Sequence, residues 1–476
     1  MAGRTLLEGV LVDWVRTQPA AEPRLPVAWL NKEQKAAELA RLQRARAMQT
    51  AREAELILGL AADCPEDMDL PPDAPGAGRS WHHTEPEFPG VSEFFPDEVA
   101  HAINLGRGTG AFRARRAFTW REELPATFAA LRHGELDEPR AAAPADVLKH
   151  ARPGLAAAVE VRLLPEAVEL SVSKLKRRAL ELLLELDADA AQQRHEEATN
   201  DADVFVEPGV DGMATIGADL PADEAAEAFN VIDELARMAK ADGDPRPIRQ
   251  IRIEIYSLLL RRPGGHGLPG VRTKLTVHAS LGALEGSSPE PGDVEGFAIT
   301  PAHLRDLLRR VGLLGLAETG EADVVFALTD DEGRLIATAT PAELERAVAR
   351  GEGLDPPPAT ESYTPTARQR RQITTRDRTC RMPNCAQRVG WADHDHVVAH
   401  SAGGRTTCTN LCCLCRHHHR LKTHARGWTF RMDPDGTLHV TSPAGITRTT
   451  RPADLRPRPP EPPPPLPDPE PDPPPF

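Results

Sequence analysis

Side chains that bind metals or move protons are concentrated between residues 380 and 424 of this chain of 476 residues. The segment CRMPNCAQRVGWADHDHVVAHSAGGRTTCTNLCCLCRHHHRLKTH contains six of the seven cysteines, the pair Asp395-His396, Asn410 and three consecutive histidines that begin at His417. No other part of the sequence gathers so many of these groups. We therefore expect the chemistry of the protein to be located here.

Two pairs of side chains have the spacing of metal ligands. Cys380 and Cys385 are separated by four residues, and Cys415 and His418 by two, so a turn can bring each pair onto one tetrahedral ion. A segment with few large apolar residues can gain its folding energy from such an ion. We expect a structural Zn²⁺ on these four residues, with His417 as an alternative to His418. Two of the other cysteines, Cys412 and Cys413, are expected to be small buried apolar side chains.

A second group of residues combines a carboxylate with imidazoles. A strand over WADHDHVV would place Asp395 and His396 on opposite faces, so the two must have different roles. A carboxylate is a hard ligand for a divalent cation, and a neutral imidazole can take a proton from water. Hydrolysis of a phosphodiester needs both functions.

The residues around this pair can complete such a site. We expect the segment 411–424 to form a helix that carries His419 back toward the strand. Asp395 and His419 would then hold one catalytic cation, with His396 as the general base. The glycines at 403 and 404 allow the intervening loop to reverse, and Asn410 can hydrogen-bond the loop backbone.

The charge of the chain is distributed unevenly. Thirteen Lys or Arg and three acids lie between Arg368 and Arg431, a local balance of +10, which leaves −24 on the rest of a chain of net charge −14. A basic module attached to an acidic body indicates a polyanion partner. The expected phosphate contacts are Arg376, Arg378, Arg416, Arg420 and Lys422.

The elements that must position this segment are mostly helices. Apolar residues at helical spacing predict one long helix or helical hairpin over 30–62, more helices between 94 and 198, and another over 221–243. Asp219 or Asp223 is expected to cap that last helix, and Gly243 to end it. Strands are expected as a hairpin turning at Asp211-Gly212, over 273–284, and over 322–339 with a turn at 331–333.

These patterns divide the chain into four regions. We expect a mostly helical body at 1–340, a Pro-rich linker at 341–366, a nuclease domain at 367–446, and a disordered Pro-rich tail at 447–476, since 14 of the last 26 residues are proline. The body contains no phosphate loop, nucleophile elbow or dinucleotide fingerprint. Without a secretory signal or an apolar spanning segment, and with clustered cysteines that suit metal binding, a cytoplasmic protein without a membrane partner is expected.

The order of these motifs resembles the HNH endonuclease family. The likeness rests on Cys-x4-Cys, Asp-x-Asp-His-Val-Val, Gly-Gly, Asn-Leu-x-x-Leu-Cys-x-x-His-His and Lys-Thr, over about residues 365 to 431. It implies a ββα-metal (His-Me finger) fold, with Asp395 and His419 as ligands of a divalent cation, His396 as general base and Asn410 as the asparagine that steadies the loop. The four zinc residues depart from the common set, which has two residues between the first cysteines and a cysteine in the last position.

The body resembles a second group of proteins. The segments VEPGVDGMATIGADLPADEAAEAFNVIDELA, TKLTVHASLGALEG and YTPTARQRRQITTRDRTCRMPNC are similar to actinobacterial HNH proteins of the 13E12-repeat group, which carry a helical domain of unknown function. This resemblance spans nearly the whole chain and leaves the role of the body open.

The sequence therefore predicts a multidomain protein: a mostly α-helical body with a few strands and a C-terminal, zinc-stapled ββα-metal domain. The expected function is metal-dependent hydrolysis of phosphodiester bonds in DNA, with RNA not excluded, using Mg²⁺ or Mn²⁺ beside a structural Zn²⁺. The alternative is a non-catalytic, zinc-containing nucleic-acid-binding protein from a mobile element.

Overall fold

The structure is a computed structural model in which the chain divides into two compact units, residues 1–57 with 116–187, and residues 58–115 with 188–476. Each unit is described by itself. The structure describes residues 25–453 with these gaps: 72–73, 77–87, 149–150, 152–153, 188–191, 193–194, 197, 201, 262–276, 281, 284–285, 295–296, 311–324, 331–333 and 352–353. The predicted turn at 331–333 and most of the predicted tail lie outside the described residues.

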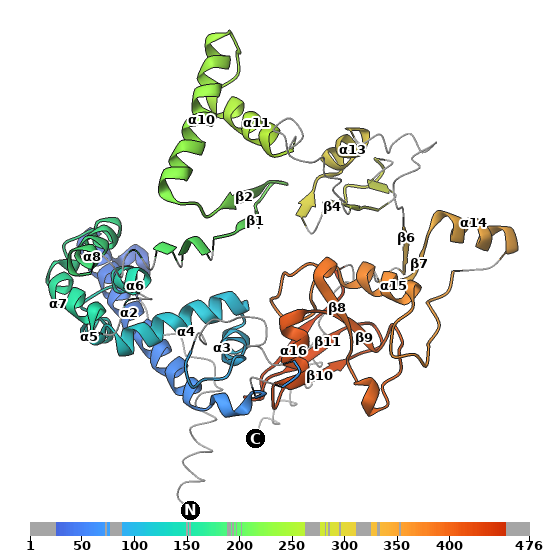
Figure 1. The fold of residues 1–476 in the computed structure, drawn as a ribbon, viewed down its shortest axis with the longest axis horizontal. Helices are drawn as coiled ribbons and strands as arrows, with labels where there is room; N and C mark the ends of the chain where they lie inside the picture. Colours follow the sequence, from blue (N-terminus) through green and yellow to red (C-terminus); the bar gives the residue numbers. More distant parts are fainter. Residues whose placement is uncertain are drawn as a thin grey trace, which may run out of the picture. The chain divides into compact units, whose positions relative to one another are not determined.

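The first unit is helical, as the apolar spacing predicts. Its helices are α2 (Lys32–Ala62) up to residue 57, α4 (Arg107–Glu122) from residue 116, α5 (Pro125–His133), α6 (Glu138–Leu148), α7 (Leu155–Ala167) and α8 (Val172–Leu186). Ser171 caps helix α8, because its side chain accepts a hydrogen bond from the Lys174 amide, and α8 packs against α6 and α7 (Figure 1). The core is built from Ala and Leu around the fully buried Trp120. None of the predicted site residues belongs to this unit.

The second unit carries short helices and small antiparallel sheets. The hairpin of β1 (Val204–Pro208) and β2 (Ala214–Ala218) turns where predicted, because Asp211 and Gly212 both have a positive φ. Helix α10 (Ala222–Ala241) ends beside Gly243 as expected, but its N-cap is Pro221, so neither Asp219 nor Asp223 caps it with a side chain. Helix α11 is Ile248–Arg261.

The middle of this unit holds two further small sheets. One contains β3 (Val277–His278), β4 (Gly292–Val294) and β5 (Phe297–Ile299), with α13 (Pro301–Arg310) after it. The other pairs β6 (Phe326–Thr329) with β7 (Leu335–Ala339). Helix α14 (Pro341–Arg350) follows within the segment that we expected to be a linker.

The C-terminal elements surround the candidate site. They are α15 (Ala367–Asp377), β8 (Ala392–His396), β9 (Leu411–Cys415), α16 (Arg416–His424), and a sheet of β10 (Thr429–Met432), β11 (Leu438–Thr441) and β12 (Thr447–Thr450). Strand β12 lies within the predicted tail and pairs with β11, so ordered structure extends past residue 446. Helix α3 (Phe95–Ile103) also belongs to this unit.

The prediction of a helix from 411 to 424 is wrong for its first five residues. Leu411–Cys415 pairs antiparallel with β8, with Asp395 opposite Cys412 and His396 opposite Leu411, and only Arg416–His424 is helical. The run LCCLC is apolar on both faces and lies between α15 and the core that contains Leu421, where a strand buried on both sides is favoured. Cys412 and Cys413 are fully buried, as predicted.

Candidate functional site

The site is built on β8, β9 and α16. The two strands form an antiparallel pair, and α16 follows β9 without a loop and packs against both strands. Successive residues on a helix point about 100° apart, so the three consecutive histidines at the start of α16 face different surroundings. His418 and His419 therefore belong to two separate groups.

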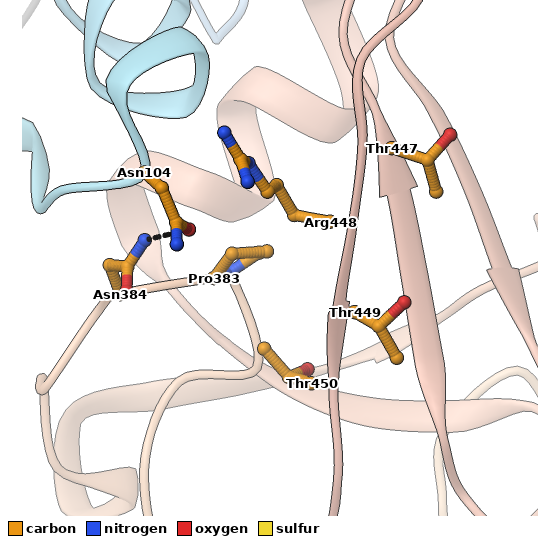
Figure 2. Close-up of a pocket in the computed structure, with 7 residues that line it drawn as sticks. All are labelled: Asn104, Pro383, Asn384, Thr447, Arg448, Thr449 and Thr450. Carbon is orange, nitrogen blue, oxygen red and sulfur yellow. Dashed lines mark hydrogen bonds between the residues drawn. The ribbon is translucent and has the colours of Figure 1, made fainter. Parts of the chain in front are cut away.

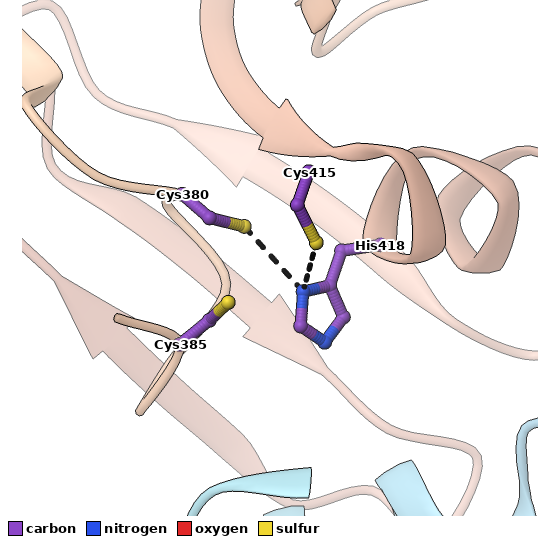
Figure 3. Close-up of side chains that lie close together, drawn as sticks. All are labelled: Cys380, Cys385, Cys415 and His418. Carbon is purple, nitrogen blue, oxygen red and sulfur yellow. Dashed lines mark hydrogen bonds between the residues drawn. The ribbon is translucent and has the colours of Figure 1, made fainter. Parts of the chain in front are cut away.

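The first group is a buried cluster of three cysteines and one histidine. The sulfurs of Cys380, Cys385 and Cys415 and one ring nitrogen of His418 all lie within 4.8 Å of one another (Figure 3). Nδ1 of His418 is 3.4 Å from Sγ of Cys380 and 3.1 Å from Sγ of Cys415. Three sulfurs and one nitrogen converging on a point are a donor set that could hold a metal ion, as the spacing predicts.

The alternative ligand His417 lies elsewhere. Its Nε2 is 2.8 Å from Oδ2 of Asp97, a residue of α3, while Nε2 of His418 is 3.2 Å from Oδ1 of the same carboxylate. The side chain of Asp97 is only 1% exposed. Because a carboxylate oxygen can only accept, the His418 Nε2–H donates to it, and the lone pair on Nδ1 then faces the sulfurs.

The pKa values of the cluster reflect burial and these hydrogen bonds. Burial favours the neutral form of Asp97, but hydrogen bonds from His417 and His418 outweigh it and hold the pKa of this carboxyl well below its usual range. Burial lowers the pKa of His418, whereas the Asp97 carboxylate and the sulfurs of Cys385 and Cys415 together raise it to about 11. A cation among the sulfurs would take the place of that proton on Nδ1.

The second group contains Asp395 and His419, which the structure brings together as predicted. Nε2 of His419 is 3.5 Å from Oδ1 of Asp395, and Nδ1 is 2.8 Å from Oδ2 of Asp393. Since Asp393 accepts from the Nδ1–H, the lone pair of His419 on Nε2 points toward Asp395. Asp393 and Asp395 are two residues apart on β8 and therefore share one face of the strand.

One carboxylate oxygen of Asp395 takes part in an ion pair but accepts no hydrogen bond from the described residues. Its Oδ2 is buried and lacks a hydrogen bond within the described part of the chain, although Nζ of Lys422 lies 2.9 Å away. The ammonium lies near the oxygen without the orientation of a hydrogen bond. A positive charge is thus already favoured at this position.

His396 follows Asp395 on β8, so its side chain leaves the opposite face of the strand, where it is held by a hydroxyl group. Its Nε2 is 2.8 Å from Oγ1 of Thr406, and that hydroxyl lies 2.7 Å from the backbone oxygen of Ser362. The single hydroxyl proton of Thr406 must go to the carbonyl, so Thr406 accepts from the His396 Nε2–H. Nδ1 is then the nitrogen of His396 that can take a proton. Burial lowers the pKa of His396 from its ordinary value of 6.5.

Rings cover His396 on two sides. Tyr363 stacks on the imidazole with the ring centroids 5.4 Å apart, and His400 contacts it edge-on at 5.5 Å. Tyr363 and Ser362 belong to the predicted linker, but the end of this segment is fastened to the site. A backbone bridge joins Thr360 to Thr406, and the Gln369 side chain bonds the Pro358 and Thr406 carbonyls.

Asn410 fastens the loop between the two strands. Its Oδ1 accepts from the amide of Val398, and its Nδ2 donates to the carbonyls of Val398 and Arg405. A Cβ atom at Gly404 would lie 1.9 Å from the Val398 carbonyl oxygen, so only glycine fits there. The expected hydrogen bonding of the loop by Asn410 is present in the structure.

Two of the five predicted phosphate contacts form hydrogen bonds with groups of the protein itself. The side chain of Arg376 is 9% exposed and donates to the carbonyls of Cys408 and Leu411, and Arg420 donates to Glu93 and the Gly76 carbonyl. We therefore withdraw these two as phosphate contacts, because their donors already serve the fold. The other members are Lys422 beside Asp395, the half-buried Arg378, and Arg416, whose side chain is 69% exposed and lies 3.1 Å from Asp393.

A hollow of about 400 Å³ has no predicted site residue in its lining. It is lined by polar side chains and one proline (Figure 2): Asn104, Pro383, Asn384, Thr447, Arg448, Thr449 and Thr450. Arg448 donates to the carbonyls of His101 and Ala102 at the end of α3.

Within the described ranges, no helix is both long and apolar enough to cross a membrane.

The residues that sequence reasoning missed lie next to those it found. Asp393 could have been found, because it is two residues before Asp395 on a predicted strand. Thr406 and Ser362 have no such signal, since a hydroxyl and a carbonyl occur everywhere in a sequence. Asp97 lies 321 positions before His418 and could not have been connected with it.

The fold and the site define a mostly helical protein with a few small sheets and a Cys/His cluster near the C-terminus that could hold a metal ion. The chain belongs to the family described as domain of unknown function DUF222, whose model matches residues 36–308.

Relatives occur in Mycobacterium tuberculosis. Uncharacterized protein Rv3776 (strain ATCC 25618 / H37Rv) is 29% identical over 306 residues, which cover 60% of this chain and 55% of the relative. Uncharacterized protein MT2160 (strain CDC 1551 / Oshkosh) is 36% identical over 157 residues, 28% of each chain. The match thus spans about half the length of the first relative and less of the second. No solved structure matches this chain.

Proposed function

We propose that this protein is a metal-dependent endonuclease of the HNH type that hydrolyses phosphodiester bonds in DNA. The observation that carries the proposal is the approach of Asp395 and His419, next to a histidine, His396, whose Nδ1 is available to take a proton. Nε2 of His419 faces Asp395 with its lone pair, and Nδ1 of the neighbouring His396 is available as a base. The β8-β9-α16 arrangement agrees with the ββα-metal fold that the sequence resembles.

The residues present fit a divalent cation. Asp395 offers a buried oxygen without a hydrogen bond, and His419 offers an imidazole nitrogen 3.5 Å from the other oxygen. Two protein donors leave room for water and phosphate oxygens, which is how Mg²⁺ is usually bound, and Mn²⁺ accepts the same ligands. When bound, such a cation stabilises negative charge on the phosphate and on the departing oxygen.

His396 supplies the base in this proposal. The Thr406 hydroxyl keeps the proton on Nε2, so Nδ1 accepts a proton from the attacking water. The lowered pKa of His396 keeps the ring neutral and ready to accept at physiological pH. Asn410 contributes by holding the loop that carries Thr406, and its role is positional.

The remaining residues would serve binding and folding. Arg416 is the exposed cation of α16 beside the site, so it is the phosphate contact that we retain first. Lys422 would be displaced from Asp395 by the divalent cation and could then contact phosphate. The Cys380, Cys385, Cys415 and His418 cluster is proposed to hold a structural Zn²⁺, since all four donors come from the protein and no position stays open for substrate.

The first experiment is nicking of supercoiled plasmid by the full chain with Mg²⁺, Mn²⁺ or EDTA. We expect cleavage that requires the divalent cation and falls by at least about 100-fold in His396→Ala, because general base catalysis contributes roughly 10²–10⁴-fold. A matched control is His439→Ala, since His439 lies on β11 and pairs with Asp433. Its cleavage should equal that of the unaltered protein.

Two results would contradict the proposal. Cleavage that His396→Ala leaves unchanged would remove His396 as the base. The second result is a protein that retains bound metal and binds DNA but does not cleave it with any of the divalent cations tested. That result would instead support the non-catalytic nucleic-acid-binding protein.

A further inference from the structure

We propose that the DUF222 region completes the C-terminal metal centre: Asp97 of α3 is a positioning residue that orients His418, and metal binding therefore fastens α3 to α16. Asp97 lies within the matched family region, whereas the four residues of the Cys/His cluster all lie after residue 379. This proposal depends on the Cys/His cluster binding a metal, and it holds whether or not the protein cleaves DNA.

The geometry at Asp97 is that of a carboxylate supporting a metal-binding histidine. Its two oxygens bond His417 at 2.8 Å and His418 at 3.2 Å, and Nε of Arg107 lies 3.4 Å from Oδ2. Burying this carboxylate costs free energy, because its charge is removed from water. The bonds from the two histidines of α16 offset that cost. Its contact with His418 fixes the tautomer that directs Nδ1 toward the three sulfurs.

Contacts on both sides of Asp97 attach α3 to the C-terminal elements. Before it, Glu93 bonds Arg420, whose guanidinium also lies over the ring of Phe94. After it, Nε2 of His101 is 3.0 Å from the Ile446 carbonyl, and Arg448 bonds the His101 carbonyl. Asp97 is thus one point of an extended contact between α3 and the elements that hold the cluster.

This arrangement links two equilibria. If docking of α3 improves the orientation of His418, it strengthens metal binding, and by reciprocity metal binding must strengthen docking by the same factor. The metal centre would then stabilise the contact between α3 of the DUF222 region and the C-terminal elements. A lone C-terminal domain would lack one of the groups that set its metal affinity.

The test measures Zn²⁺ affinity of the full chain by competition with a chelating dye, without DNA. We expect Asp97→Ala to weaken Zn²⁺ binding by about 10–100-fold, the usual effect of losing such a supporting group. The matched control is Glu98→Ala, because Glu98 is the next residue in the first turn of α3 and interacts with Cys64 instead. Asp97→Asn, which retains one acceptor oxygen, should fall between them.

A second measurement uses the unaltered protein, so it does not depend on a variant that folds. We expect removal of Zn²⁺ with EDTA to speed hydrogen exchange of the amides of 95–103, while those of α7 stay unchanged. Either of two results would overturn the proposal. One is a Zn²⁺ affinity of Asp97→Ala within twofold of that of the unaltered protein. The other is a rate of hydrogen exchange in α3 that is the same with and without Zn²⁺. Absence of cleavage in the plasmid assay would leave both results intact.

Discussion

Two histidine-centred sites lie on the same short helix and differ in how they are built. His418 faces three sulfurs in a buried cluster, and His419, the next residue, faces a single carboxylate at Asp395. In both cases a carboxylate accepts from the other ring nitrogen and so sets the tautomer. For His418 this is Asp97 from α3, and for His419 it is Asp393 from the adjacent strand.

The difference separates structural from chemical roles. A group of four protein donors has no vacancy for substrate, whereas two donors leave most of the coordination of a divalent cation to water and phosphate. The closed cluster depends on a residue over 300 positions away, while the open pair is assembled within 27 residues. Stability should therefore depend on the first site and activity on the second.

The largest expected effect tests this division. Cys415→Ala removes a donor from the closed cluster, and zinc binding in small domains is worth about 10–16 kcal/mol of folding free energy. We expect loss of bound zinc and a strongly lowered Tm, measured by elemental analysis and thermal unfolding. His419→Ala should keep both zinc and Tm while abolishing plasmid cleavage. An unchanged Tm in Cys415→Ala would contradict the assignment of stability to the closed cluster.

The next effect concerns the last residue of α15, which bonds to strand β9. Asp377 is fully buried, accepts from the Cys413 amide at 2.8 Å, and pairs with Arg376 and Arg381. Asp377→Asn leaves two buried cations without a counter-charge, so we expect a loss of about 3–5 kcal/mol in the free energy of unfolding. Denaturant titration at neutral pH measures it.

The same residue predicts a dependence on pH. Burial would raise the pKa of Asp377, but the neighbouring guanidinium groups lower it below the ordinary 3.8. Its contribution to stability is therefore complete above pH 3.8 and is lost as the pH falls through the lower, folded-state pKa. Asp377→Asn should lack this acid-dependent part. Parallel pH profiles of the two proteins would contradict the assignment.

A smaller effect distinguishes the supporting carboxylates. Asp393→Asn should lower cleavage by about 10–100-fold, because it no longer fixes the His419 tautomer, and should leave zinc content unchanged. The control is Asp433→Asn: Asp433 also bonds a histidine at 2.8 Å and its side chain is 35% exposed, against 34% for Asp393. Equal activity of the two variants would show that Asp393 has no part in the reaction.

The smallest effect concerns the base. Thr406→Val removes the acceptor of the His396 Nε2–H at nearly constant shape, and we expect cleavage to fall about tenfold as the ring samples the other tautomer. Thr406→Ser should retain most activity. Nitrogen NMR of the imidazole should report a proton on Nε2 in the unaltered protein and a mixture in Thr406→Val. An unchanged tautomer would refute the role of Thr406.

What could be predicted from the sequence is local. Spacing alone paired Cys380 with Cys385 and Cys415 with His418, because a turn or one helical turn has a fixed reach. Period-two and period-3.6 patterns likewise found the β1–β2 hairpin and the long helix α2. The mutual approach of Asp395 and His419 was also predicted, since the glycines at 403 and 404 allow the chain between their elements to reverse.

What the tertiary structure decided is burial and distant partners. The run LCCLC is a strand because both of its faces are covered, and no local propensity reveals that covering. Arg376 and Arg420 read as surface cations until their carbonyl and carboxylate partners are seen. Asp97 reaches His418 across more than 300 residues, and such a contact arises only from packing, because sequence separation carries no information about distance once the chain is folded.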